Sequence, residues 1–299
     1  MSAIIVKDLT KRLGKKVILS GVNLEIQEGE FFSVLALEGQ GKTTIARILF
    51  NYLKPSIGNA YIFDLDFNRD SKEIKETTTY VPEEFLFQEN IKAVSLLKKT
   101  LAFHGLKNTE ELDYLIDYFS FNRKIRINDM TENEKKIFSI INALIVKPRV
   151  LILDEPAKGL SIEQKVKVFD YLKQLQKEEG VTILMLTDSL IDAQNYCDRA
   201  AYLHDGNIKY TEYLKDKIAN DKIIKIYSPL NDINPFLEIG SKTIKNSPEE
   251  KILYFDGDMK ELSRLIANLQ IDNYSIEDSS LYDKILAYYD NKEVADSDI

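Results

Sequence analysis

A short run of glycine, lysine and threonine has the composition of a phosphate-binding loop. It follows the apolar segment 31–35, which predicts a buried strand, and it opens a helix that we expect over residues 43–52. Glycines let backbone N–H groups approach an anion closely, and a helix N-terminus adds a partial positive charge. We expect Lys42 to reach the β- and γ-phosphates of a nucleotide and the Thr43 hydroxyl to bind Mg²⁺. The residues expected to bind the nucleotide here are Gly39, Gln40, Gly41, Lys42, Thr43 and Thr44.

The loop departs from the usual pattern at its first position. Ala36 stands where the first glycine is expected, six residues before Lys42. Alanine is the smallest departure, but its Cβ narrows the range of backbone angles. A plain glycine-containing turn is the simpler alternative. The sequence Lys-Thr-Thr between a strand and a helix argues against it.

An acidic pair follows a second apolar strand. Residues 150–153 are Val-Leu-Ile-Leu, and they lead directly into Asp154 and Glu155. Asp154 is placed to hold Mg²⁺ at the carboxyl end of the strand, and Glu155 can polarise an attacking water as the general base. Alone, such a pair is usually a solvated turn. Together with the phosphate loop, it predicts a nucleotide-hydrolysing site.

The order of strands and helices indicates an α/β fold. Apolar segments of strand length alternate with amphipathic helices, which is typical of a sheet covered on both faces. With the phosphate loop, this predicts a P-loop NTPase-type mixed sheet. We expect a nucleotide-binding domain over residues 1–220 with a helical subdomain inserted at about 89–135. A small C-terminal α+β domain over 221–290 and an acidic tail over 291–299 should follow.

Composition limits the classes of partner. The chain has 40 Lys and Arg against 48 Asp and Glu, a net charge of −8, which argues against a nucleic-acid partner. The lone Cys197 cannot form an intramolecular disulfide, which fits a reducing cytoplasm. No apolar run approaches the roughly 20 residues of a membrane helix. A membrane function would therefore need a separate membrane-spanning polypeptide.

These motifs resemble those of the ATP-binding cassette (ABC) family, and the resemblance covers nearly the whole chain. Residues 150–160 resemble the magnesium-carboxylate strand of that family and its following loop. Residues 80–83 resemble the loop that joins the core to the helical subdomain, with Glu83 where many members have Gln. Residues 257–262 and 280–286 resemble the C-terminal domain of single-cassette subunits of drug, peptide and lipid exporters.

The resemblance implies ATP-driven export with ATP and Mg²⁺ as cofactors. It implies two partners, a multi-span membrane subunit and a second ATP-binding subunit in a homodimer or heterodimer. The chain would lie in the cytoplasm, peripheral on the inner face of the cell membrane. A groove near residues 83–87 would receive a cytoplasmic helix of the membrane subunit, with Phe85, Leu86 and Phe87 as an apolar patch. Internal packing of these three side chains is the equal alternative.

Several family positions are altered. The signature loop, normally Leu-Ser-Gly-Gly-Gln, falls at Thr131, 23 residues before Asp154, and Glu132 and Asn133 replace its glycines. Asp188 stands where a histidine normally contacts the γ-phosphate. Leu13 stands where an aromatic side chain normally stacks on adenine.

These losses predict slow hydrolysis. Ser161 also replaces an Asp that normally crosses the dimer interface. Losing one transition-state donor costs roughly 10²–10³ in rate in comparable sites. One rival interpretation is a regulatory ATP-binding module with little or no hydrolysis. Another is a soluble ABC protein acting on ribosomes or DNA, but such proteins usually carry two cassettes or a long coiled-coil insertion.

Overall fold

The computed structural model describes residues 1–299 except 86–89, 215–220, 231 and 291–299. Contacts divide the chain into two units. The first comprises Met1–Asp188 and Tyr196–Lys215, and the second comprises Ser189–Asn195 and Asp216–Ile299. Residues 189–195 therefore group with the C-terminal unit, although the sequence prediction assigned them to the nucleotide-binding domain. Leu86, Phe87 and the predicted acidic tail lie outside the described residues.

A six-stranded sheet forms the centre of the first unit. Its order is β10-β9-β3-β8-β7-β6, and β10 is antiparallel to β9 while the other neighbours are parallel. Strands β3, β7 and β8 are buried at every position, as a parallel sheet covered on both faces requires. The strands are β3 (Phe31–Leu35), β6 (Thr78–Val81), β7 (Val150–Asp154), β8 (Thr182–Thr187), β9 (Arg199–His204) and β10 (Asn207–Tyr213).

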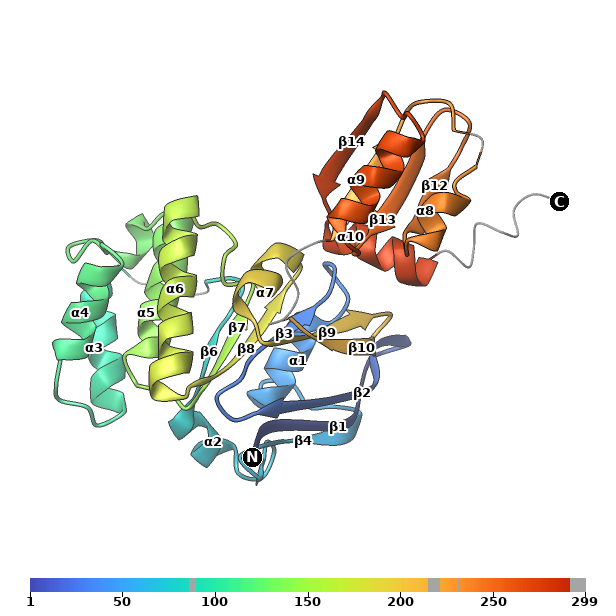
Figure 1. Cartoon of the computed structure of the whole chain (residues 1–299). Coiled ribbons are helices and arrows are strands. Elements are labelled where there is room, and N and C mark those ends of the chain that lie inside the picture. The colour runs from blue at the N-terminus through green and yellow to red at the C-terminus, as the bar shows by residue number, and fades with distance from the viewer. Residues whose placement is uncertain (86–89, 215–220, 231, 291–299) are drawn as a thin grey trace. The chain divides into compact units, whose positions relative to one another are not determined.

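A second, antiparallel sheet shares a hydrophobic core with the first. Its order is β2-β1-β4-β5. The core joins both sheets through helix α1 (Lys42–Leu49), which buries Ile45, Ala46, Ile48 and Leu49 between them (Figure 1). This packing fixes the start of α1, and hence the phosphate loop, against the sheet. The strands are β1 (Ser2–Leu13), β2 (Lys16–Gln27), β4 (Ile57–Ile62) and β5 (Leu65–Asp66).

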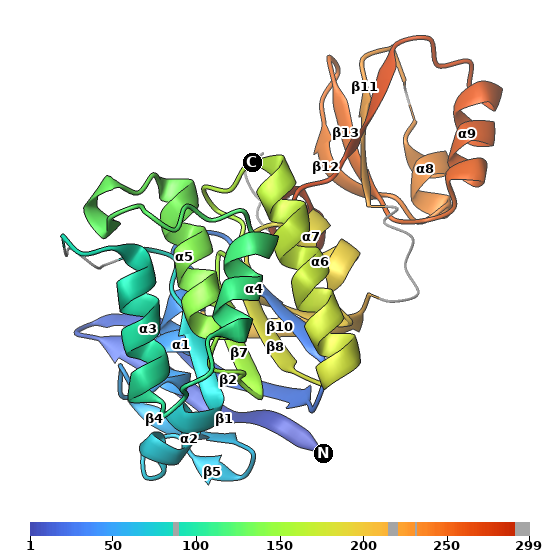
Figure 2. The ribbon, with the colours of Figure 1, turned by 90° about the vertical axis from the view of Figure 1, so that its left-hand side faces the viewer.

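Four helices gather on one side of the six-stranded sheet (Figures 1 and 2). They are α3 (Ala93–Phe103), α4 (Glu110–Tyr118), α5 (Glu132–Leu144) and α6 (Ile162–Glu179); a short α2 (Ser71–Thr77) precedes β6. Helix α5 contacts β6 and continues past residue 135, where the sequence prediction ended the helical subdomain. Within the described ranges, no helix combines the length and apolar character needed to cross a membrane.

The C-terminal unit has its own antiparallel sheet in the order β12-β13-β11-β14. Helices α8 and α9 pack with it around Phe236, Leu253, Phe255 and Leu262. Its elements are α7 (Leu190–Tyr196), of which residues up to Asn195 belong here, then β11 (Lys222–Ile226), α8 (Asn234–Glu238), β12 (Lys242–Asn246), β13 (Lys251–Phe255), α9 (Met259–Asn268), β14 (Tyr274–Asp278), α10 (Leu281–Ile285) and a final short π-helix η2 (Leu286–Asp290). The α/β class predicted from the sequence is confirmed.

A buried ion pair fastens α10 to the start of β11. Lys284 Nζ lies 3.1 Å from Asp221 Oδ2, and the two side chains are 1% and 4% exposed. The Gln194 side chain donates a second hydrogen bond to the same oxygen at 2.7 Å. Buried charges of this kind are stable only while both partners are present.

Replacing Lys284 with Ala should destabilise the C-terminal unit by about 3 kcal/mol or more, because the buried Asp221 carboxylate would lose its counter-ion. Urea unfolding followed by circular dichroism measures the loss. Lys222→Ala is the matched control, since Lys222 pairs with Asp278 at the surface and such pairs contribute about 0–1 kcal/mol. Equal losses in the two variants would show that the buried pair is not important for stability.

Candidate nucleotide-binding site

Four neighbouring parallel strands bring the predicted residues to one edge of the sheet. The phosphate loop follows β3, Asp154 ends β7, Asp188 follows β8 and Glu83 lies just beyond β6. Because the carboxyl ends of parallel strands meet at one edge, residues far apart in sequence become neighbours there. The sequence-predicted residues Lys42, Thr43, Glu83, Asp154, Glu155 and Asp188 are thereby collected in one region.

The phosphate loop requires glycine at its last position. Gly41 has φ 102°, and a Cβ there would lie 2.8 Å from Leu19 Cδ2 and 3.2 Å from the Ile18 carbonyl oxygen. Ala36, in contrast, is absent from the positive-φ residues, is fully buried, and donates its N–H to the Thr187 carbonyl at 3.2 Å. It therefore extends the β3–β8 pairing without backbone strain, and alanine is compatible with the loop at this position.

Lys42 is held by groups of the site itself. Its Nζ lies 2.7 Å from Glu155 Oε1 and donates to the Ala36 carbonyl at 2.5 Å. The lysine is only 7% exposed. A phosphate at the N-terminus of α1 would therefore have to compete with Glu155 for this cation.

Glu155 is oriented by three donors. Besides Lys42, the Thr187 hydroxyl donates to Oε2 at 3.0 Å and the Asp188 backbone N–H donates to Oε1 at 3.1 Å. Its backbone is in the left-handed region, with φ 45°. Burial raises the pKa of Glu155, Lys42 acts in the opposite direction, and the negative charge of Asp188 raises it further. A carboxylate with a raised pKa near a phosphate loop is suited to take a proton from water.

Asp154 offers an oxygen for a metal ion. It is fully buried, and Tyr80 donates its hydroxyl to Oδ2 at 3.2 Å. Its other oxygen, Oδ1, is buried and has no hydrogen-bond partner in the described part of the chain. Burial raises the pKa of Asp154, whereas the Thr43 and Tyr80 hydroxyls beside it act to lower it. This oxygen-only set of Asp154 and Thr43 fits Mg²⁺.

The metal site would need ligands from the nucleotide as well. Within the described ranges, no group of three or more His, Cys, Asp or Glu residues could hold a metal ion. Mg²⁺ commonly takes one or two protein ligands and completes its shell with phosphate oxygens and water. The predicted set Thr43 and Asp154 therefore fits Mg²⁺ bound together with a nucleotide.

Other predicted residues have mainly structural contacts. The Gln40 side-chain oxygen accepts the Asp205 N–H at 2.9 Å, and Thr44 lies in the first turn of α1. Thr131 lies at the N-terminus of α5, where it forms a reciprocal capping box with Glu134. Leu13, 54% exposed, ends β1 opposite Lys16.

Four residues near the site were not predicted from the sequence. Tyr80 and Thr187 bond the two acidic residues, and Lys136 and Lys158 contact Glu83. The sequence could have indicated Lys136, because it lies four residues before Ile140 on the buried face of an amphipathic helix, where a lysine is unusual. Nothing in the sequence could have indicated Lys158, since its contact with Glu83 depends on how the loops after β6 and β7 meet.

The ABC transporter family model matches residues 19–158. The spermidine/putrescine import ATP-binding protein of Mesoplasma florum is 32% identical over 213 residues, which cover 68% of this chain but 59% of that protein's length. An uncharacterised ABC transporter ATP-binding protein of Methanocaldococcus jannaschii is 29% identical over 279 residues, which make up 91% of this chain and 96% of that protein. A dimeric, post-hydrolysis cassette structure bound to ADP and Pi is 25% identical, with a TM-score of 0.65 over 71% of this chain and 99% of that one.

Asp188→Asn should lower the pKa of Glu155, because it removes a negative charge that raises that pKa. A general base works when deprotonated, so the acid limb of kcat for ATP hydrolysis should move to lower pH. The measurement is kcat against pH for both proteins, with the exposed Asp272→Asn as control. An acid limb that stays in place, or moves to higher pH, would rule out this electrostatic coupling.

Proposed function

We propose that the chain is the ATP-binding subunit of an ABC exporter with slow hydrolysis; the match of residues 19–158 to the ABC transporter family model and the likeness to a solved ATP-binding cassette support this. The observation that carries the proposal is the group formed by Lys42, Asp154 and Glu155, which lie beyond the carboxyl ends of β3 and β7 on either side of β8. Its parts supply a phosphate-binding cation, a metal-binding carboxylate and a general base.

The residues act by positioning and charge. When the nucleotide binds, Lys42 breaks its ion pair with Glu155 and contacts the β- and γ-phosphates instead. Glu155 then keeps its hydrogen bonds from the Thr187 hydroxyl and the Asp188 N–H. In that position Glu155 accepts a proton from water. Mg²⁺, held by Thr43 and Asp154, would neutralise charge on the phosphates. Tyr80 fixes the orientation of the Asp154 carboxylate.

Three replacements support slow turnover. Asp188 carries a carboxylate where a donor to the transferring group is needed, and a lost donor costs roughly 10²–10³ in rate. At α5, Glu132 and Asn133 add side chains where glycines allow close approach to a phosphate. The Thr131 hydroxyl is already bonded with Glu134, at 2.8 Å from Glu134 Oε2. ATP binding and closure of a dimer would then matter more than rapid hydrolysis.

A pocket beside the site supports a membrane partner. Its two adjoining parts have volumes of about 460 Å³ and 560 Å³, and their lining comes mainly from α1, β6, α5, the segment 82–85 and residues 158–159. Phe85 packs edge-on against Phe138, with ring centroids 5.5 Å apart. We propose that this groove receives a cytoplasmic helix of a separate multi-span subunit, at the inner face of the cell membrane. A second ATP-binding subunit, identical or different, completes the assembly.

The direction of transport rests on the C-terminal unit. The motifs at 257–262 and 280–286 favour export. They include Asp258 and Ser280, which cap α9 and α10. Among the relatives, the M. florum protein is named for import. The energy-coupling factor transporter ATP-binding protein of Acetivibrio thermocellus is 27% identical over 80% of this chain and 92% of its own. Transport into or out of vesicles carrying the assembled complex distinguishes the two directions.

Measured with purified protein, Lys42→Ala should abolish binding of a fluorescent ATP, because the main cation for the phosphates is lost. Glu155→Gln should keep binding and abolish the weak turnover of the wild type. Binding with no turnover even beside the membrane partner would favour the regulatory module. Wild-type turnover near the median enzyme rate of about 10 s⁻¹ would contradict slow hydrolysis.

A further inference from the structure

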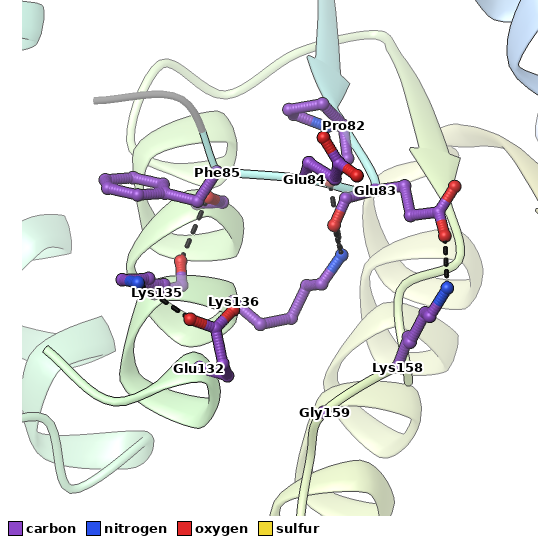
Figure 3. A pocket seen from close by; sticks show the side chains of 10 residues that line it. Pro82, Glu83, Glu84, Phe85, Glu132, Lys135, Lys136, Lys158 and Gly159 are labelled. Carbon is purple, nitrogen blue, oxygen red and sulfur yellow. Dashed lines mark hydrogen bonds and ion pairs between the residues drawn. The ribbon is translucent and has the colours of Figure 1, made fainter. Parts of the chain in front are cut away.

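A cluster of charged side chains surrounds Glu83 in a pocket of about 460 Å³ (Figure 3). The pocket lies between the segment 82–85, the first turns of α5 and the loop that follows Pro156. Its charged lining consists of three lysines and three glutamates, namely Lys135, Lys136, Lys158, Glu83, Glu84 and Glu132. Two of them, Glu83 and Lys136, interact electrostatically with Asp154, but none of the six has a part in the mechanism above.

The backbone at Glu83 is fixed by a buried lysine. Lys136 is 6% exposed, and its Nζ donates to the carbonyl oxygens of Pro82 at 3.2 Å and Glu83 at 2.9 Å. Burial lowers the pKa of Lys136, while Asp154, Glu83 and Glu155 oppose this effect. The loop that carries Glu83 is therefore tied to helix α5.

The side chain of Glu83 is held from the opposite direction. Figure 3 shows Lys158 reaching from its loop to the Glu83 carboxylate, with which it forms an ion pair. The Lys158 backbone N–H donates to the Glu155 carbonyl at 3.2 Å. Lys158 thus joins the Glu83 loop to the turn that carries the general base.

Glu83 lines the same pocket as Thr43, one of the two proposed Mg²⁺ ligands. Its negative charge contributes to the raised pKa of Asp154. A second carboxylate in this pocket would attract Mg²⁺, but the Lys158 cation paired with it offsets that attraction. Since the Lys158 side chain is 60% exposed and that of Glu83 is 29% exposed, their pair is weak enough to be exchanged.

We propose that Lys158 is a positioning residue that holds the Glu83 carboxylate away from the Mg²⁺ site, so that lysine and metal compete for it. When Mg-ATP binds, Glu83 leaves Lys158 and turns toward the metal or its water shell. The loop that carries Lys158 is released in the same step. This inference rests on the proposed binding of Mg-ATP at the phosphate loop.

Lys158→Met tests the competition. The Mg²⁺ concentration for half-maximal binding of a fluorescent ATP should fall about threefold in low salt, as expected for a surface ion pair. The difference should shrink at high salt because exposed charges are screened. Lys177→Met, which removes an exposed lysine near the end of α6, is the control and should leave the Mg²⁺ dependence unchanged.

Two further measurements distinguish competition between Lys158 and Mg²⁺ for Glu83 from a general effect of removing a positive charge. In a Glu83→Gln background, Lys158→Met should no longer alter the Mg²⁺ dependence; an equal shift there would overturn the proposal. In EDTA without nucleotide, Lys158→Met should speed the exchange of the backbone amide hydrogens of residues 83–85. An unchanged rate of hydrogen exchange would show that the Lys158–Glu83 ion pair does not hold this segment in place. Wild-type protein that fails to bind ATP would contradict the proposed function. The hydrogen-exchange measurement would still show whether Lys158 holds the Glu83 segment in place.

Discussion

The ion pair between Lys42 and Glu155 is the interaction on which the site depends. Both side chains are nearly buried, and each would be costly to bury alone. Their contact requires β3 and β7 to end together, with β8 between them to supply Thr187 and the Asp188 N–H. The fully buried strands and the α1 core provide the rigid frame that holds these ends in register.

The balance of charge at this edge distinguishes the chain from the pattern it resembles. Glu83, Asp154, Glu155 and Asp188 place four carboxylates where a polyanion must bind. Three lysines compensate, with Lys42 at the phosphate loop and Lys136 and Lys158 at the Glu83 loop. Glu83, at a position where many family members have Gln, therefore comes with two cations, Lys136 and Lys158. This arrangement supports the proposal that the site binds ATP but hydrolyses it slowly.

Much of the fold could be read from the sequence because the informative patterns are local. The apolar strands 31–35 and 150–153 and the residues just after them marked the sheet and its reactive edge. Ala36 was predicted to restrict the backbone of the phosphate loop. The structure shows no such restriction, because the backbone at this position does not adopt a conformation that requires glycine. The partners of Glu83 could not be read, because Lys136 and Lys158 reach it from segments more than 50 residues away. The grouping of residues 189–195 with the C-terminal unit likewise depends on tertiary contacts.

The affinity of Glu155→Gln for a non-hydrolysable ATP analogue with Mg²⁺, measured by calorimetry, tests the central claim most directly. If the phosphates must take Lys42 from Glu155, neutralising Glu155 frees the lysine and should tighten binding by about tenfold, equivalent to about 1.4 kcal/mol. Affinity equal to or weaker than that of the wild type would contradict the account, because Lys42 would then bind phosphate without giving up an ion pair.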